Sequence, residues 1–180
     1  MHAYQAAAAE PAAREADTRC DLSAADHAAT KHLICELAGI DRALATEIEQ
    51  SYADFATYKT YPEVVDVITA LTDAGVGVAI ISDFHVDLRP HLDSIGLLDR
   101  ISGFALSCEV GATKPDRAMF EAALSQLEAP PERCLMVGDN PHPDSGAAPL
   151  GITTLLLPVQ RAPRPPLLDN VRALVLGEIW

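Results

Sequence analysis

Short apolar runs alternate with helical periodicity along the last two thirds of the chain. The clearest run, Val76–Ser82, is unbroken and rich in β-branched residues, which is typical of a strand covered on both faces. Similar runs lie at 103–106, 134–138 and 152–157. Stretches with helical spacing of apolar residues precede, separate or connect them, at 60–75, 88–95, 116–127 and 145–150. Strands separated by helices predict a parallel α/β sheet with right-handed crossovers.

The first third of the chain has a helical pattern throughout. Residues 1–20 are rich in Ala, and we expect either a frayed helix or a loose, flexible segment there. Ser23 and Asp26 resemble a capping box at the start of an amphipathic helix. Gly39 is the expected end of this helix, and Asp41 is the expected N-cap of a second one.

Composition limits the class of protein. The chain has 180 residues, of which 49% are hydrophobic and 22% charged, enough for one domain with a continuous core, or one domain with a small helical attachment. Its net charge of -13 repels phosphate backbones, so we expect no nucleic-acid partner. No apolar run approaches the roughly 20 residues that a membrane span needs, so we expect no membrane partner.

The compartment is indicated by the cysteines and the N-terminal residues. The first 20 residues lack the basic start and long apolar stretch of a secretory signal. The 4 cysteines are scattered, with no pair at metal-ligand or redox spacing. We therefore expect reduced thiols in a cytoplasmic protein.

Residues with chemical potential follow three of the apolar runs. They are Ser82, Asp83 and His85 after the first run, Lys114 at the mouth of the helix after the second, and Asp139, Asn140, His142 and Asp144 after the third. Because ligands of parallel sheets bind beyond the carboxyl ends of the strands, these residues are expected on one rim. A hydroxyl and a lysine suit an oxyanion, and paired carboxylates suit Mg²⁺.

This ordered set resembles the haloacid dehalogenase (HAD) superfamily, whose members are mostly Mg²⁺-dependent phosphatases with a Rossmann-like core. The resemblance covers residues 61–158. It implies that Ser82 binds the phosphoryl group and that Lys114, in the segment GATKPDRAMF, stabilises the reaction intermediate. It also implies that Asp139 and Asp144, in VGDNPHPDSG, hold magnesium.

The resemblance divides the chain into three parts. Residues 1–20 form the Ala-rich N-terminal segment, residues 21–59 are the remains of a helical cap, and residues 60–180 form the HAD-like α/β core. The expected fold class is α/β, with a Rossmann-like parallel sheet and a small, reduced cap.

The family's first motif, a hydrophobic strand ending in Asp-x-Asp, does not occur in this sequence. That motif supplies the nucleophile and the general acid/base in the family. Neither Asp17, Asp21 nor Asp26 follows an apolar strand or has an Asp two positions on. Without the motif, Mg²⁺ loses a carboxylate and a carbonyl ligand, so we expect weakened binding or none.

The strand that carries this motif usually lies at the centre of the sheet, where unpaired buried backbone groups cost kilocalories each. We expect direct pairing of the neighbouring strands, a segment from a second chain, or the C-terminal residues 170–180 to close the gap. The last segment contains Ala-Leu-Val-Leu and fits a strand, but its apolar spacing favours a helix. An uncovered core edge also favours a homodimer or a partner protein.

Two histidines lie outside the family pattern. His85 and His142 are expected as exposed loop residues, the alternative being that one acts as acid/base or nucleophile in place of the missing aspartates. Glu109 is a further possible site carboxylate, with lower odds than the residues above. His27 and His32 lie five apart, a spacing that does not align two metal ligands on one helical face.

Two classes of function follow. The first is an enzyme that acts on a small anionic or phosphorylated metabolite without a phospho-aspartate intermediate. Its catalytic residues are His85, Lys114, Asp139 and His142, with Ser82, Asp83, Lys114 and Asn140 binding the ligand. The alternative is a non-catalytic pseudo-phosphatase that binds a ligand or a partner protein. A third possibility is an ordinary phosphatase whose first strand is encoded upstream.

Overall fold

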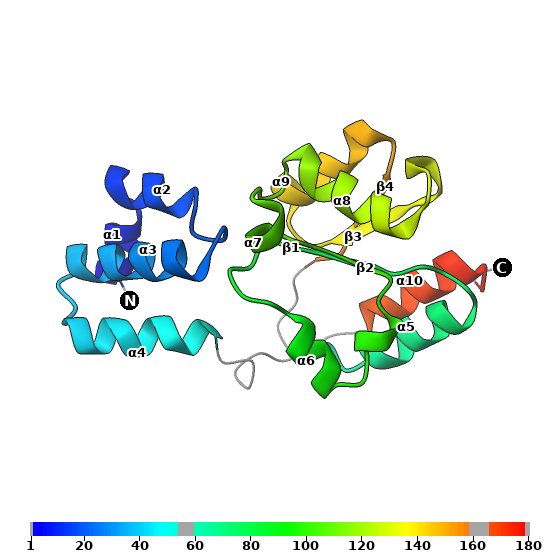
Figure 1. Ribbon diagram of the computed structural model, residues 1–180, viewed down its shortest axis with the longest axis horizontal. Coiled ribbons are helices and arrows are strands. Elements are labelled where there is room, and N and C mark those ends of the chain that lie inside the picture. Colours follow the sequence, from blue (N-terminus) through cyan, green and yellow to red (C-terminus); the bar gives the residue numbers. More distant parts are fainter. Residues whose placement is uncertain (1, 54–59, 159–165, 179–180) are drawn as a thin grey trace.

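The computed structural model describes residues 2–53, 60–158 and 166–178. A helical N-terminal part and an α/β part lie next to each other along the long axis of the molecule (Figure 1). The helical part contains α1 (His2–Ala8), α2 (Pro11–Asp17), α3 (Ala24–Leu37) and α4 (Arg42–Ala53). Residues 1–20 therefore contain two short helices. Of the two alternatives for this segment, a helix or a loose stretch, the structure has the helical one.

Capping and small apolar residues hold the helical part together. The Ser23 hydroxyl accepts a hydrogen bond from the Asp26 N–H at 3.0 Å, as the capping-box pattern predicts. Asp41 caps α4 by accepting from two N–H groups of its first turn. Ala7, Ala13 and Ile34 form the buried contact of α1 and α2 with α3.

The α/β part follows the predicted alternation. Its elements are α5 (Val64–Asp73), β1 (Ala79–Ser82), α6 (Arg89–Ser94), η2 (Leu98–Arg100), β2 (Gly103–Leu106), α7 (Ser107–Val110), α8 (Arg117–Leu127), η3 (Pro131–Arg133), β3 (Leu135–Gly138), α9 (Pro141–Asp144), η4 (Ser145–Leu150), β4 (Thr153–Leu156) and α10 (Leu167–Leu176). The helix expected at 145–150 is a 3₁₀ helix that contains Pro149, a residue that removes an N–H donor from a regular α-helix.

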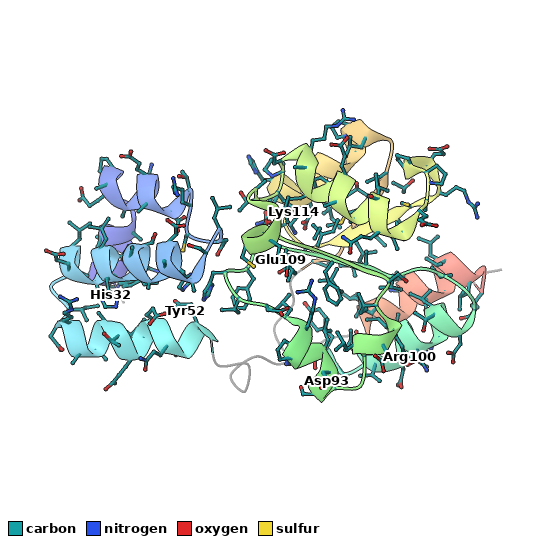
Figure 2. All side chains as sticks on the ribbon, viewed as in Figure 1. His32, Tyr52, Asp93, Arg100, Glu109 and Lys114 are labelled. Carbon is teal, nitrogen blue, oxygen red and sulfur yellow. The ribbon has the colours of Figure 1, made fainter. Side chains whose placement is uncertain are left out.

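Helices cover both faces of the strands. Figure 1 shows α8 and α9 on one side of the strands and α5 and α10 on the other. The side chains spread over both layers and over the helical part (Figure 2). Met119 and Phe120 of α8 form a buried cluster with Ala147 and Ile152, and Ile81 and Met136 pack against it. Within the described residues, no helix is both long enough and apolar enough to cross a bilayer.

The strands form two separate parallel pairs. β1 pairs with β2, with Ala79 opposite Gly103, and β3 pairs with β4, with Leu135 opposite Thr153. Among the described residues no strand joins β1 to β3. The expectation that these neighbours pair directly is therefore wrong, and the C-terminal segment is the helix α10 up to Leu176.

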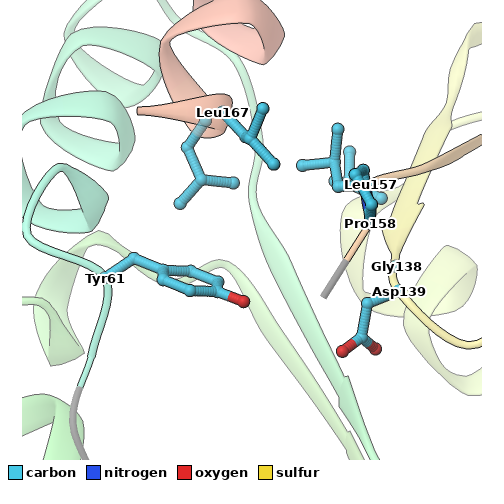
Figure 3. A pocket seen from close by; sticks show the side chains of 8 residues that line it. Tyr61, Gly138, Asp139, Leu157, Pro158 and Leu167 are labelled. Atoms are coloured by element: carbon cyan, nitrogen blue, oxygen red, sulfur yellow. The ribbon is translucent and has the colours of Figure 1, made fainter. Parts of the chain in front are cut away.

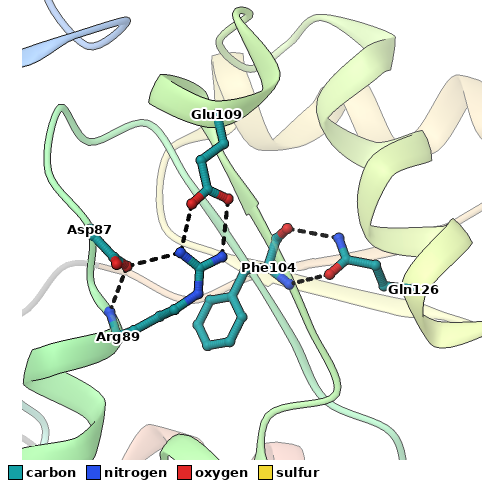
Figure 4. A network of polar contacts seen from close by, with 5 residues as sticks. All are labelled: Asp87, Arg89, Phe104, Glu109 and Gln126. Carbon is teal, nitrogen blue, oxygen red and sulfur yellow. Dashed lines mark hydrogen bonds and ion pairs between the residues drawn. The ribbon is translucent and has the colours of Figure 1, made fainter.

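Hydrogen bonds at the strand ends and edges show which way the strand backbones face. The side chain of Gln126 pairs with both backbone groups of Phe104 (2.9 and 2.7 Å), so the two flanking residues of β2 face β1 (Figure 4). On β1, the backbone carbonyl of Val78 accepts from the Ser102 N–H, so Val78 faces β2. Because successive peptide groups of a strand point to opposite sides, the N–H of Ile81 points away from β2.

The same reasoning applies to the other pair. Cys134 accepts from Thr153 and Gly138 accepts from Leu157, so the intervening peptide groups of β3, those of Leu135 and Val137, point away from β4. All residues of β1 and β3 are only half-buried, although both strands are apolar. Within the described ranges, the two pairs thus present edges without a neighbouring strand where the central strand of the family was expected.

We predict that amide hydrogen exchange alternates along these strands. The N–H groups of Ile81 and Val137 should exchange at least about tenfold faster than those of Ile80 and Met136, because only the N–H groups of Ile80 and Met136 point toward the paired strand. Residue-resolved exchange measured by NMR tests this. Equal protection of all four amides would show that the gap is filled.

Candidate functional site

A buried ion pair lies at the carboxyl ends of the strands. The Lys114 ammonium donates to Asp144 Oδ1 at 2.7 Å, and the two side chains are 13% and 2% exposed. The other oxygen of Asp144 accepts from the N–H groups of Asp139 and Asn140 at 3.0 and 2.9 Å. The carboxylate therefore fixes both the lysine and the loop that follows β3.

The electrostatics of Asp144 follow from these contacts. Burial raises the pKa of its carboxyl, but the hydrogen bonds from Lys114 and from the two backbone N–H groups outweigh burial and lower that pKa. A side chain on Gly138 would collide with the Asp144 carboxylate, so the close approach of loop and carboxylate requires glycine there.

Asp83 joins the loop after β1 to the same cluster. Its Oδ1 accepts from the backbone N–H of Lys114 at 2.9 Å. Burial raises the pKa of Asp83, partly offset by the hydrogen bond and the charge of Lys114. Ser82, the last residue of β1, is half-buried beside it. The three loops predicted to share a rim thus meet through Asp83, Lys114 and Asp144.

A cavity of about 270 Å³ opens beside the exposed carboxylate of Asp139 (Figure 3). Its lining is mostly apolar and comes from the end of β3, the segment after β4 and the start of α10: Val137, Gly138, Leu157, Pro158, Leu167 and Leu168, together with Tyr61 and Asp139. The Tyr61 hydroxyl points across the cavity toward Asp139. Asp139 thus offers a carboxylate at the mouth of a site large enough for a small molecule.

The expected magnesium pair does not fit this geometry. Asp144 is almost fully buried, and both of its oxygens already accept hydrogen bonds. A cation on Asp144 would also meet the positive charge of Lys114 at close range. Asp139 fits a cation, but a single carboxylate is a weak Mg²⁺ site. We therefore assign Asp144 to holding Lys114 and no reaction step to a metal.

His85 is not an exposed loop residue. It is 4% exposed and stacks on His27 of α3, with the ring centroids 3.5 Å apart and an angle of 13° between the planes. Neither ring nitrogen of His85 has a hydrogen-bond partner among the described residues, and burial lowers its pKa. The contact with the helical part, absent from the local sequence pattern, places this histidine at the junction of the two parts.

His142 is exposed but lies apart from Asp139. It lines a second cavity, of about 450 Å³, together with Pro115, Arg117 and residues of η4. His142 belongs to the short helix α9 and does not line the cavity of Asp139, although the two residues are three apart in sequence. His142 is thus exposed, as expected, and lines a different cavity from the one beside Asp139. Asn140 contributes its N–H to Asp144 and exposes its side chain.

Glu109 belongs to a surface ion cluster. Both of its carboxylate oxygens accept from the Arg89 guanidinium, at 2.6 and 3.0 Å, and Asp87 accepts from the same guanidinium at 3.2 Å (Figure 4). The guanidinium also lies 4.6 Å from the centre of the Phe104 ring. Glu109 therefore orients Arg89 and is unsuited to act as a base.

Ser107 is a junction residue that the sequence analysis missed. Its buried hydroxyl accepts from the Phe84 N–H at 3.1 Å and donates to the Asp21 carbonyl at 2.5 Å. It thereby connects the ends of β1 and β2 to the helical part. Its position directly after the apolar run 103–106 was a usable signal, the same one that singled out Ser82.

Comparison with known proteins identifies the family. A model of the haloacid dehalogenase-like hydrolases matches residues 3–149, and the chain belongs to this family. The resemblance inferred from the strand-end residues is thus confirmed, and the match includes most of the helical part.

Two curated relatives show the extent of the similarity. Phosphoserine phosphatase of Thermus thermophilus is 34% identical over 103 residues, which cover 57% of this chain and 41% of the relative. The human haloacid dehalogenase-like hydrolase domain-containing protein 3 is 30% identical over 141 residues, covering 75% of this chain and 56% of the relative. The chain spans about half the length of these relatives.

Solved structures confirm the fold class. A HAD phosphatase from Thermococcus onnurineus superposes with a TM-score of 0.60 at 23% identity, covering 80% of this chain and 69% of that one. A 2-haloacid dehalogenase from Pseudomonas syringae reaches 0.64 at 22% identity, covering 92% and 76%. These likenesses establish the HAD-like α/β fold with its parallel strands.

We predict that Asp144→Asn lowers the free energy of unfolding by about 3–5 kcal/mol, because it leaves the buried Lys114 ammonium without its counter-charge. Asp139→Asn, at an exposed position, should change it by less than about 0.5 kcal/mol. Urea unfolding of both variants at pH 7 measures the difference.

The pH dependence has a defined sign. Because the pKa of Asp144 is lower in the folded than in the unfolded chain, its contribution is present above the unfolded value of about 4 and is lost as pH falls through the folded value. The difference in free energy of unfolding between wild type and Asp144→Asn should therefore become smaller as the pH falls below about 4. Equal free energies of unfolding of Asp144→Asn and Asp139→Asn at pH 7 would contradict this role of Asp144.

Proposed function

We propose that this HAD-like hydrolase acts on a small anionic or phosphorylated metabolite at the rim formed by the loops after β1, β2 and β3. The observation that carries the proposal is the Asp144 carboxylate, which holds the Lys114 ammonium on one oxygen and the Asp139 N–H on the other, with the exposed Asp139 carboxylate at the mouth of a cavity. The relatives support the substrate class, since two of them are named phosphoserine phosphatase and glyceraldehyde 3-phosphate phosphatase.

The charges of the rim restrict how an anion binds. Asp144 offsets Lys114, which leaves Asp83 and Asp139 as excess negative groups. Burial raises the pKa of Asp83, and the hydrogen bond and charge of Lys114 partly offset this shift. We assign ligand binding to Lys114, Ser82, Asp83 and the Asn140 amide. The apolar cavity then accommodates the uncharged part of the substrate.

We assign proton transfer to Asp139. No Asp-x-Asp occurs in the 180 residues, so these residues offer no nucleophile of the family's type. A water molecule attacks the phosphorus and gives one proton to the Asp139 carboxylate while the bond from phosphorus to the leaving alkoxide breaks. The protonated Asp139 then returns this proton to the alkoxide, so the products are the alcohol and inorganic phosphate. Under this proposal no phospho-aspartate forms on residues 1–180.

The proposal includes a cytoplasmic location, which the four free cysteines support, and assembly as a homodimer or with a partner protein.

We predict turnover of small phosphate monoesters that depends on Asp139. With p-nitrophenyl phosphate, phosphoserine and glyceraldehyde 3-phosphate as probes, Asp139→Asn should lower kcat/KM at least about 100-fold, since a positioned acid/base contributes this much. His142→Ala is the matched control and should stay within twofold, because its side chain lines the other cavity. Mass spectrometry after acid quenching should detect no phosphorylated aspartate, and a phosphorylated aspartate would contradict the mechanism.

The non-catalytic alternative is favoured by one structural feature, the edges of β1 and β3 that no strand of the described part of the chain pairs with. A protein that binds a ligand or partner without reaction needs the rim but no acid/base. Sulfate separates the two functions: if it raises the Tm of wild type but not that of Lys114→Met, the rim binds anions. Anion binding without turnover of any probe would establish the non-catalytic function. Absence of both would contradict either proposal.

A further inference from the structure

A second cluster of metal-ligating side chains lies in the helical part, outside the rim. Cys20 and Asp21 belong to the turn between α2 and α3, and His27 lies in the first half of α3. One ligand atom from each residue lies within 4.8 Å of the other two. The Cys20 thiol and the His27 ring are 4% and 3% exposed, and Asp21 is half-buried. The seven-residue separation within one chain reversal, instead of a helical spacing, concealed this cluster in the sequence.

The distances fit a tetrahedral cation that prefers sulfur and nitrogen. Bond lengths of about 2.3 Å to sulfur and 2.0 Å to nitrogen place the two ligand atoms about 3.5 Å apart. Cys20 Sγ and His27 Nδ1 are 3.3 Å apart. The Asp21 carbonyl is held by the Ser107 hydroxyl, whereas its carboxylate accepts no hydrogen bond from the described residues and needs to move by only about 1 Å.

The charges also balance. A thiolate, a carboxylate and a neutral imidazole bound to a divalent cation sum to zero, which reduces the cost of burial. Lys31 is the opposing group: its positive charge acts on Cys20, while its ammonium also lies 5.1 Å from the centre of the Tyr52 ring. A cation therefore competes with Lys31 for the thiolate, and this competition provides a test.

An independent observation comes from the buried imidazoles. The Nε2 atom of His27 and both ring nitrogens of His85 are buried without hydrogen-bond partners in the described part of the chain. The two rings stack 3.5 Å apart, so His85 adds unpartnered buried nitrogens directly beside the cluster. Because buried polar atoms without partners are costly, these nitrogens mark the surroundings of the cluster as a polar site that the described residues leave unsatisfied.

We propose that Cys20, Asp21 and His27 bind a thiophilic divalent cation of the Zn²⁺ type. The cation fixes the turn before α3 to that helix, on the face that contacts the core through Ser107 and His85. It thereby orders the surface of the helical part that contacts Ser107 and His85. Three protein ligands leave the fourth tetrahedral position to a non-protein ligand, the coordination typical of an open zinc site.

Titration of the full metal-free chain with Co²⁺ tests this site. We expect one equivalent to give the visible absorption of tetrahedral cobalt and a near-ultraviolet thiolate-to-cobalt charge-transfer band, both bleached by Zn²⁺. Zn²⁺ should also raise the Tm. Cys20→Ser should abolish the charge-transfer band, and Asp21→Asn should weaken Co²⁺ binding at least about tenfold. Lys31→Met should strengthen it, because it removes the competing charge.

Cys35→Ser is the matched control, since Cys35 is a buried cysteine of α3 outside the cluster. This variant should keep the charge-transfer band, and circular dichroism of each metal-free variant establishes that it is folded. Absence of the band in wild type, or its persistence in folded Cys20→Ser, would overturn the proposal. If Cys20→Ser does not fold, unchanged Co²⁺ affinity in Asp21→Asn would overturn it instead.

Discussion

The rest of the structure depends on the ion pair between Lys114 and Asp144. Lys114 follows the β1–β2 pair and Asp144 follows β3, and no described backbone pairing connects the two strand pairs. The halves are held together by this buried pair, by the apolar cluster beneath α8 and by the packing of α10 on α5. Breaking a buried pair by removing one partner costs several kcal/mol. One interaction thus positions the rim and contributes to the integrity of the core.

The same arrangement explains why the rim has the chemistry it has. The Asp144 carboxylate is hydrogen-bonded to Lys114 and orients it. Asp139 is therefore the carboxylate of the predicted metal pair that faces the cavity. The cavity lies beside the unpaired edge of β3, and a smaller one of about 60 Å³ lies on the α8 side between Ile81 and Met136. Cavities lie on both faces of the gap between the β1–β2 and β3–β4 pairs because the two pairs do not pack edge to edge. The helical part is attached independently, through Ser107 and the stacked histidines.

Strands and rim were predictable because their signals are local. An unbroken apolar run places each strand to within about three residues, and ordered polar residues after three runs indicated the family. The roles of single residues were less predictable. Burial of His85 depends on His27, 58 positions away, and the direction of His142 depends on the four-residue helix α9. The Cys20 cluster depends on a chain reversal that no periodicity indicates.

The most direct test of the account is the coupling free energy between Lys114 and Asp144. It is obtained from a double-mutant cycle with Lys114→Met, Asp144→Asn and the double variant, each measured by urea unfolding at pH 7. Because the two side chains share a buried ion pair, the account predicts a coupling of at least about 1.5 kcal/mol, with the double variant more stable than additivity allows. Additive effects within about 0.5 kcal/mol would contradict it.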